Sequence, residues 1–179
     1  MQQIINPVPK VLQMKKIALF LSLPFLVMIF MSCSKNSSCS AVDTNKVAPA
    51  AEVANLQDSL AKYGIEATQH PSGIFYKIIN PGSGGIVSNL CTQVSATYWG
   101  GFFDGRSFDQ SSSPLTFTLG ATIVGWHKGI PLVKEGGEIE IYIPPSLGYG
   151  NEDMKDNNGV VVIPKNSYLV FKVKVVKFS

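Results

Sequence analysis

The chain has 179 residues, 45% of them hydrophobic, which is enough for one compact domain with appendages. Its formal net charge is +3, but three lysines stand before residue 33, and the remaining chain has 12 basic and 12 acidic residues. A near-neutral chain without a basic stripe lacks the electrostatic footprint of a nucleic-acid-binding protein. We therefore exclude nucleic acid as a partner.

The first residues are typical of an export leader. Lys15 and Lys16 precede an apolar run over residues 17–31. A basic start, a short apolar stretch and small residues at its end describe a signal peptide, and the run is shorter than the roughly 20 residues of a membrane-spanning helix. We expect a signal peptide over residues 1–32, with Met14 as an alternative start that leaves residues 1–13 outside it.

Cys33 ends this leader in the sequence Phe30-Met31-Ser32-Cys33, which resembles a bacterial lipobox. The resemblance implies lipidation of Cys33 and a membrane anchor, since two or more acyl chains hold a protein stably where one does not. A serine rather than an aspartate follows Cys33, which resembles the signal that sorts lipoproteins to the outer membrane. We therefore expect a periplasm-facing lipoprotein in the bacterial envelope. Ordinary secretory cleavage, with Cys33 a plain thiol, is the alternative.

Residues 33–51 are rich in Ser, Asn, Ala and Val without periodicity, which predicts a flexible tether. Apolar residues then recur at helical spacing, so we expect an amphipathic helix over residues 52–63 and a linker up to residue 72. Two cysteines follow the leader, and one pair could form in an oxidising compartment. Because Cys39 lies in the expected tether, we expect Cys39 and Cys91 to be free thiols. No Cys or His spacing predicts a metal site.

From Gly73 onward the pattern favours strands. Apolar residues alternate with polar ones over residues 139–143 and 168–178, which predicts strands with one buried and one largely exposed face. Residues 124–133 are the one stretch here that favours a helix, and Pro131 limits its length. We expect an α+β domain, a half-covered antiparallel sheet with a short helix across its buried face.

Nine short motifs follow one another between Gly73 and Phe178. They are Val94-Ser-Ala-Thr-Tyr98-Trp-Gly100, Asp104-Gly-Arg-Ser-Phe108-Asp109, Phe117-Thr-Leu-Gly120, Thr122-Ile-Val-Gly-Trp126, Gly129-Ile-Pro-Leu-Val-Lys-Glu-Gly136, Ile143-Pro144, Gly148-Tyr149-Gly150, Ile163-Pro164 and Leu169-Val-Phe171. In this order they resemble FKBP-type peptidyl-prolyl cis-trans isomerases over residues 73–179. The resemblance implies a curved antiparallel sheet wrapped around one short helix, with an apolar pocket between them.

The resemblance also implies the site residues. Catalytic positions would be Tyr98, Phe108, Asp109, Ile123, Trp126, Tyr149 and Phe171, and further substrate contacts would be Leu115, Thr122, Val162 and Ile163. Trp126 would form the pocket floor, while the Ile123 N–H and the Tyr149 hydroxyl would bind ligand carbonyls. The implied partners are proline-containing polypeptides and macrolide inhibitors.

These residue types suit amide rotation. The barrier of roughly 18–20 kcal/mol comes from resonance in the planar amide, so a catalyst must bind the twisted amide better than either planar form. No bond breaks, so no cofactor is expected. A non-catalytic peptide-binding or chaperone module of the same fold is the alternative, and a structural envelope protein that uses the domain for dimer contacts is a third hypothesis.

Some positions depart from the family pattern. Residues 109–114 form a shorter segment and lack the usual Arg near Asp109, while Leu115 replaces a frequent aromatic and Trp99 replaces a usual Thr. These departures bear on efficiency and on macrolide affinity. His127 directly follows Trp126, and neighbouring side chains on a helix point about 100° apart. We therefore expect His127 to be exposed rather than catalytic.

Overall fold

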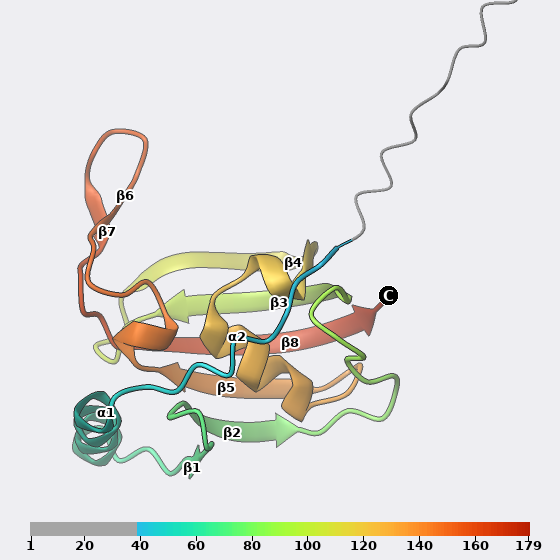
Figure 1. Cartoon of the computed structure of the whole chain (residues 1–179), viewed down its shortest axis with the longest axis horizontal. Coiled ribbons are helices and arrows are strands. Elements are labelled where there is room, and N and C mark those ends of the chain that lie inside the picture. The colour runs from blue at the N-terminus through green and yellow to red at the C-terminus, as the bar shows by residue number, and fades with distance from the viewer. Residues whose placement is uncertain (1–38) are drawn as a thin grey trace, which may run out of the picture. The chain divides into compact units, whose positions relative to one another are not determined.

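The computed structural model describes residues 39–179 (Figure 1). The expected signal peptide and the Cys33 lipidation site lie outside the described residues and stay predictions. Within residues 39–179, none of the helices has both the length and the apolar character needed to cross a membrane.

The described chain contains two α-helices, three 3₁₀ turns and eight strands. In chain order they are α1 (Ala50–Lys62), β1 (Thr68–Gln69), β2 (Phe75–Asn80), β3 (Gln93–Gly101), β4 (Ser107–Thr118), η1 (Leu119–Ala121), α2 (Val124–Gly129), η2 (Ile130–Leu132), β5 (Glu138–Ile143), η3 (Pro145–Leu147), β6 (Met154–Lys155), β7 (Val161–Ile163) and β8 (Leu169–Phe178). The helix predicted over 124–133 is thus a short α-helix that tightens into a 3₁₀ turn, where Pro131 removes a backbone donor.

Six strands form one antiparallel sheet in the order β1-β2-β5-β8-β3-β4. Strands β6 and β7 pair separately as a hairpin that stands away from this sheet (Figure 1). The antiparallel α+β fold expected from the sequence is confirmed. Strand β4 runs from Ser107 to Thr118, so the short segment over residues 109–114 is part of the strand. Residues 112–114 bulge outward opposite Thr97 of β3.

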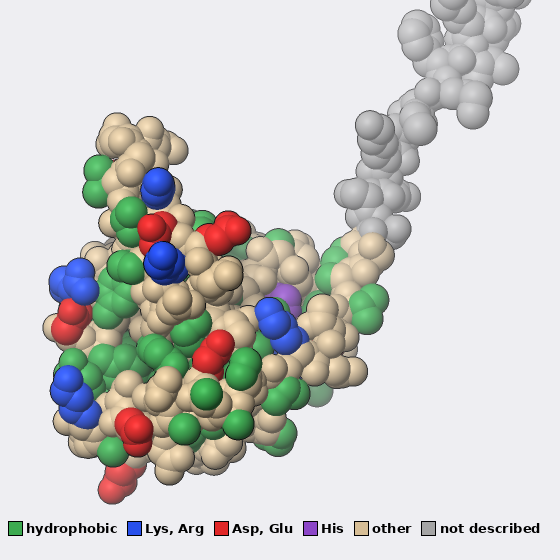
Figure 2. Space-filling model, turned by 60° about the vertical axis from the view of Figure 1, so that its left-hand side comes forward, with side chains coloured by type: hydrophobic (Ala, Val, Ile, Leu, Met, Phe, Trp, Pro, Cys, Tyr) green, Lys and Arg blue, Asp and Glu red, His purple; other side chains and the backbone are tan. Residues whose placement is uncertain are grey.

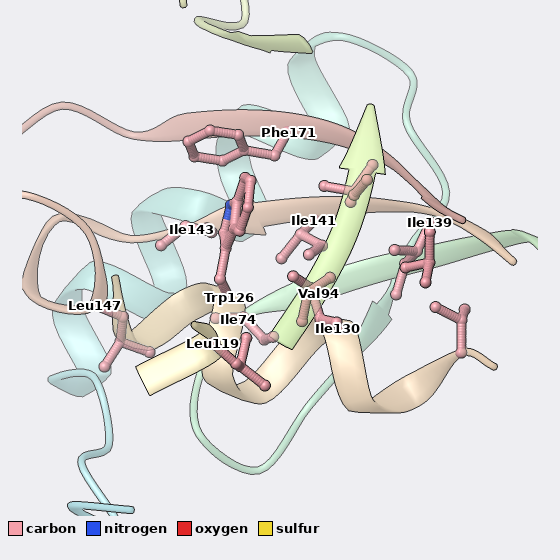
Figure 3. Close-up of a cluster of buried hydrophobic side chains, with 14 of the residues drawn as sticks. Ile74, Val94, Leu119, Trp126, Ile130, Ile139, Ile141, Ile143, Leu147 and Phe171 are labelled. Atoms are coloured by element: carbon pink, nitrogen blue, oxygen red, sulfur yellow. The ribbon is translucent and has the colours of Figure 1, made fainter. Parts of the chain in front are cut away.

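One face of the sheet carries the main hydrophobic core, and α2 lies across it. Side chains from β3, β5 and β8 that point to this face are buried: Val94, Ala96, Ile139, Ile141, Ile143, Leu169, Phe171, Val173 and Val175. From the opposite side, Trp126 and Ile130 point into the same core (Figure 3). Alternation along β5 and β8 therefore identified the inner face correctly.

Two glycines let α2 approach the sheet closely. A Cβ placed on Gly125 would lie 2.5 Å from Cδ1 of Ile143, and one placed on Gly129 would lie 2.5 Å from Cδ1 of Ile141. Real Cβ atoms do not tolerate such distances, so any larger residue would push the helix outward. This contact fixes how deeply Trp126 sits.

One end of the second face of the sheet is covered by α1, while Lys172, Lys174 and Val176 farther along β8 are exposed. Leu56 and Leu60 of the helix pack with Phe75, Tyr142 and Val170 in a separate buried cluster. The prediction that Tyr142 faces solvent is wrong, since its side chain is only 1% exposed. Strand alternation shows which residues share a face, but the second layer that covers this face is a helix remote in sequence.

Trp99 also belongs to this outer cluster, where it packs at the edge of the buried residues. Trp99 is therefore separated by the sheet from the pocket discussed below. The departure from the family pattern at this position therefore lies on the face that receives α1. The surface seen in Figure 2 intersperses basic and acidic side chains, in keeping with the neutral balance of the sequence.

Residues 39–48, here called the strap, lie against the domain. Cys39 forms a disulfide with Cys91, and their Cα atoms are 5.6 Å apart. Ala41 packs against the main core, Ala48 is buried within it, and the Ala48 N–H donates to the Ser72 carbonyl at 2.9 Å. The expectation of free thiols is wrong. Most strap side chains are exposed, and the strap meets the domain at Ala41, at Ala48 and through the disulfide.

We expect Gly129→Ala to destabilise the protein. Overpacking against Ile141 costs about 1–3 kcal/mol, more than the roughly 1 kcal/mol that Ala gains over Gly in a helix. Urea unfolding followed by circular dichroism measures the difference. Ile141→Val removes the crowding methyl group, so the double variant should lose less stability than the sum of the two single changes. A strictly additive result would contradict the proposed contact.

Candidate functional site

A cavity of about 550 Å³ opens between α2, the segment before it and the inner face of β3, β4 and β8. It is lined by Tyr98, Asp109, Leu115, Thr116, Phe117, Ala121, Thr122, Ile123, Trp126, Tyr149 and Phe171. Most of these side chains are aromatic or aliphatic, and Asp109 is the one ionisable carboxylate among them. Apolar walls with a few polar groups are the usual composition of a small-ligand site.

Trp126 lies at the centre of the aromatic wall and is 6% exposed. Its ring centroid is 5.4 Å from that of Tyr98 and 5.2 Å from those of Phe117 and Phe171. The edge-on contacts with Tyr98 and Phe171 are a favoured aromatic geometry. The indole of Trp126 stands on α2 and reaches toward Phe171 on β8 (Figure 3). Packing on three sides therefore holds this ring in one orientation.

Tyr98 and Asp109 form a polar pair at the edge of the cavity. The Tyr98 hydroxyl donates a hydrogen bond of 2.6 Å to Oδ2 of Asp109. Burial, followed by this bond, raises the pKa of Tyr98 to about 12, so the hydroxyl stays a donor at neutral pH. The segment after Asp109 lacks the Arg that is usual in the family, so another group must restrain this carboxylate. Tyr98 supplies that restraint from the neighbouring strand.

The two hydrogen-bond donors that the resemblance assigns to ligand carbonyls are available at the cavity. Within residues 39–179, none of the hydrogen bonds uses the Ile123 N–H or the Tyr149 hydroxyl as a donor. Burial, and then the charge of Asp109, raise the pKa of Tyr149, so its hydroxyl keeps its proton at neutral pH. Ile123 directly precedes α2 and its carbonyl already accepts from Trp126. Both donors are thus held beside an apolar wall.

The rim is formed by the bulged part of β4. Leu115 follows the bulge and is 48% exposed at the cavity mouth. A flexible aliphatic side chain here makes a softer wall than an aromatic ring would. The short segment over residues 109–114 stays paired with β3 on both sides of the bulge.

Eight of the predicted site residues line the cavity, and three do not. Phe108 forms a second layer behind the wall, with its ring centroid 5.6 Å from Phe171 and 6.5 Å from Tyr149. Ile163 is buried in the main core, and Val162 lies on the β6–β7 hairpin. Their predicted substrate contacts are not part of the cavity lining.

Sequence reasoning missed three lining residues, namely Thr116, Phe117 and Ala121. Phe117 could have been found, because it lies two residues after Leu115 on a strand and therefore shares its face. Thr116 and Ala121 flank predicted residues and carry no pattern of their own.

His127 differs from its prediction. The side chain is half-buried, and its Nε2 is buried without a hydrogen-bond partner among the described residues. Burial lowers the pKa of His127 below its usual 6.5. His127 does not line the cavity, so the prediction that it stands apart from the pocket agrees with the structure, while its predicted exposure is wrong. The charge of Asp43 in the strap acts in the opposite direction and raises the pKa of His127, but by less than burial lowers it.

Comparison with known proteins places this geometry in a family. The family model described as FKBP-type peptidyl-prolyl cis-trans isomerase matches residues 87–176. The chain is 39% identical over 127 residues to a probable FKBP-type isomerase, FkpA, of Neisseria meningitidis, covering 69% of this chain and 44% of that protein. It is 39% identical over 106 residues to FkpA of Escherichia coli, covering 58% of this chain and 37% of that one.

Solved structures agree. The crystal structure of FkpA from Escherichia coli has a TM-score of 0.61 at 32% identity and covers 73% of this chain and 60% of that chain. A peptidyl-prolyl cis-trans isomerase from Pseudomonas syringae has a TM-score of 0.61 at 27% identity, covering 74% and 97%. The chain belongs to the FKBP-type peptidyl-prolyl cis-trans isomerase family. It spans less than half of the length of the curated relatives named above.

We expect His127 to make stability fall with acid. Because its pKa is lowered in the folded state, the unfolded chain takes up the proton first. The stabilising contribution is complete above about pH 6.5 and is lost as pH falls through the lower folded value. Urea unfolding of His127→Gln between pH 7 and pH 5 should show a shallower decline than the parent.

His70 provides a matched comparison, because burial also lowers its pKa. His70→Gln should remove a separate part of the pH dependence, and the double variant should combine both effects. If the free energy of unfolding falls equally with pH in the parent and in His127→Gln, the prediction is wrong, because His127 would then have the same pKa in the folded and unfolded states.

Proposed function

We propose that this domain accelerates rotation about Xaa-Pro peptide bonds. The observation that carries the proposal is a cavity walled by Tyr98, Phe117, Trp126 and Phe171, with the Ile123 N–H and the Tyr149 hydroxyl available as donors at its edge. A proline ring is compact and apolar, so an aromatic slot suits it. Family membership supports the same activity.

The reaction needs binding rather than bond chemistry. Resonance makes the planar amide dipolar and resists rotation by roughly 18–20 kcal/mol. A twisted amide loses this charge separation, so an apolar wall opposes it less than it opposes the planar form. Selective binding of the twisted state therefore lowers the barrier without a nucleophile.

Each donor has a role in this scheme. The Ile123 N–H is fixed by its position before α2, and the Tyr149 hydroxyl is protonated at neutral pH. Donors held in advance at the carbonyls flanking the rotating bond need no reorganisation during the reaction. Asp109 orients Tyr98 through their hydrogen bond and adds negative charge at the edge of the slot.

We infer that the clients are proline-containing polypeptides in the bacterial envelope, with the domain held by lipidated Cys33 and facing the periplasm. The leader pattern of residues 15–33 supports this location. The Cys39–Cys91 disulfide is compatible with an oxidising compartment. Macrolides that occupy the same slot would act as inhibitors.

A second function, binding of unfolded chains without catalysis, is favoured by the β6–β7 hairpin. Met154, Val160 and Val161 are exposed there, and Figure 2 shows hydrophobic side chains on the stem of this projection. The hairpin follows closely after Tyr149 in the chain. Exposed apolar residues on a projecting hairpin would add contacts to an unfolded client.

We expect the full chain, purified in detergent, to accelerate isomerisation of an Xaa-Pro tetrapeptide. Trp126→Phe should lower kcat/KM by roughly tenfold, which corresponds to about 1.4 kcal/mol of lost transition-state contact. Trp99→Phe is the matched control, since Trp99 lies on the opposite face of the sheet, and it should retain the parent rate. No acceleration by the folded parent would refute the isomerase function.

A variant of the β6–β7 hairpin distinguishes the binding function from the isomerase function. Met154→Ser/Val160→Ser should reduce suppression of aggregation of a reduced, unfolding client, because it removes exposed apolar contacts. The same variant should keep the parent rate on a tetrapeptide too short to reach the hairpin. Suppression that persists in a parent without isomerase activity would favour the binding function.

A further inference from the structure

We propose that the strap, residues 39–48, positions the wall of the cavity that contains Trp126, and that the Cys39–Cys91 disulfide makes this positioning dependent on thiol redox state. The idea rests on the proposed isomerase function only for its effect on rate. Its structural part concerns how η1 and α2 are held from the side opposite the sheet. In Figure 1 the strap passes in front of α2 on its way to α1.

The first contact is with the segment that leads into α2. A Cβ on Gly120 would lie 2.5 Å from Cβ of Ala41, so the strap touches the backbone of η1 directly. Gly120 also donates to the Leu90 carbonyl at 2.7 Å, next to the disulfide-bonded Cys91. The strap, η1 and the chain before β3 thus meet at one place.

The second contact is with the last turn of α2. Lys128 Nζ lies 2.5 Å and 2.6 Å from the two carboxylate oxygens of Asp43. The Lys128 side chain is only 11% exposed. The Asp43 side chain is 46% exposed, so solvent screens this pair and weakens its attraction. The pair therefore adds a modest attachment of the strap to α2, beside the Ala41 contact and the disulfide.

These two contacts enclose the residues that form one side of the cavity. Ala121, Thr122, Ile123 and Trp126 all lie between Gly120 and Lys128 and line the cavity. The sheet supports this segment from one side through Gly125 and Gly129, as described above, and the strap supports it from the other. A movement of the strap would therefore move the Trp126 wall and the Ile123 donor together.

The disulfide decides whether the strap stays in place. The strap forms no helix or strand, and ordering such a segment costs conformational entropy that a few contacts scarcely offset. Cys39 is exposed and Cys91 is half-buried, so a reductant can reach the bond. When the cross-link is cut, the free end gains the freedom that the bond had removed.

The redox step is ordinary thiol–disulfide exchange with a dithiol reductant. One reductant thiolate attacks a sulfur of the Cys39–Cys91 bond and forms a mixed disulfide, and the other protein sulfur leaves as a thiolate that takes up a proton. The second reductant thiolate then closes a cyclic disulfide on the reductant and frees the second protein thiol. Two electrons and two protons pass to the protein.

The test uses the full chain in detergent, oxidised or reduced with dithiothreitol. We expect reduction to lower kcat/KM on an Xaa-Pro tetrapeptide by about tenfold, less than the roughly hundredfold that an ångström of misplacement can cost. We also expect faster amide hydrogen exchange in residues 119–129, measured by mass spectrometry. Exchange in β8 serves as the internal reference and should stay unchanged.

Two variants serve as controls. Cys39→Ser/Cys91→Ser should match the reduced parent without any reductant and should not respond to dithiothreitol, which excludes effects at Cys33. Asp43→Asn keeps the disulfide and weakens the attachment to α2, so it should raise exchange in residues 119–129 under oxidising conditions. Thermal melts show whether each variant is folded at the assay temperature.

The outcomes separate the two proposals. Unchanged exchange in residues 119–129 on reduction would overturn the positioning role, and an equal increase in β8 would do the same by showing general destabilisation. If the oxidised protein is inactive, and reduction still raises amide exchange in residues 119–129, the isomerase function fails and the positioning role stands. If activity is present and unaffected by reduction while exchange rises, the proposed coupling to the reaction is wrong.

Discussion

The close approach of α2 to strand β5 determines the depth of the cavity. Gly125 and Gly129 allow the helix backbone to lie directly on Ile143 and Ile141. Trp126 lies between these glycines in the sequence, so its position follows that of the helix. The helix cannot move closer to the sheet without a clash, and it cannot move away without losing core contacts. The aromatic wall depends on this one spacing, because Tyr98, Phe117 and Phe171 are fixed to the sheet, whereas Trp126 is fixed to the helix.

The polar groups of the cavity complement that wall without introducing reactive chemistry. Tyr98 is held by Asp109, and the Tyr149 hydroxyl and the Ile123 N–H remain available as donors. The raised pKa values of Tyr98 and Tyr149 keep both phenols neutral across the physiological range. Such a site discriminates by shape and hydrogen bonding, which is what a reaction that only rotates an amide requires.

The local alternation of apolar and polar residues was sufficient to predict which face of a strand is buried. Alternation predicted the inner faces of β5 and β8, whereas the resemblance to the FKBP family implied most of the cavity lining. Contacts between distant segments left no such pattern. Tyr142 was expected to face solvent because alternation does not reveal a helix on the far face, and Cys39 was expected to be free because nothing in residues 39–48 indicates contact with Gly120 or Lys128.

The disulfide also determines how mechanical load would cross the molecule. Tension applied between the chain ahead of Cys39 and any point beyond Cys91 passes directly across the sulfur bridge. Residues 40–90, with α1 and β2, are then shielded from that tension. With the bridge reduced, the same pull would run along the strap and peel Asp43 away from Lys128 before it reached the sheet. One covalent bond thus selects which non-covalent contacts are the first to break.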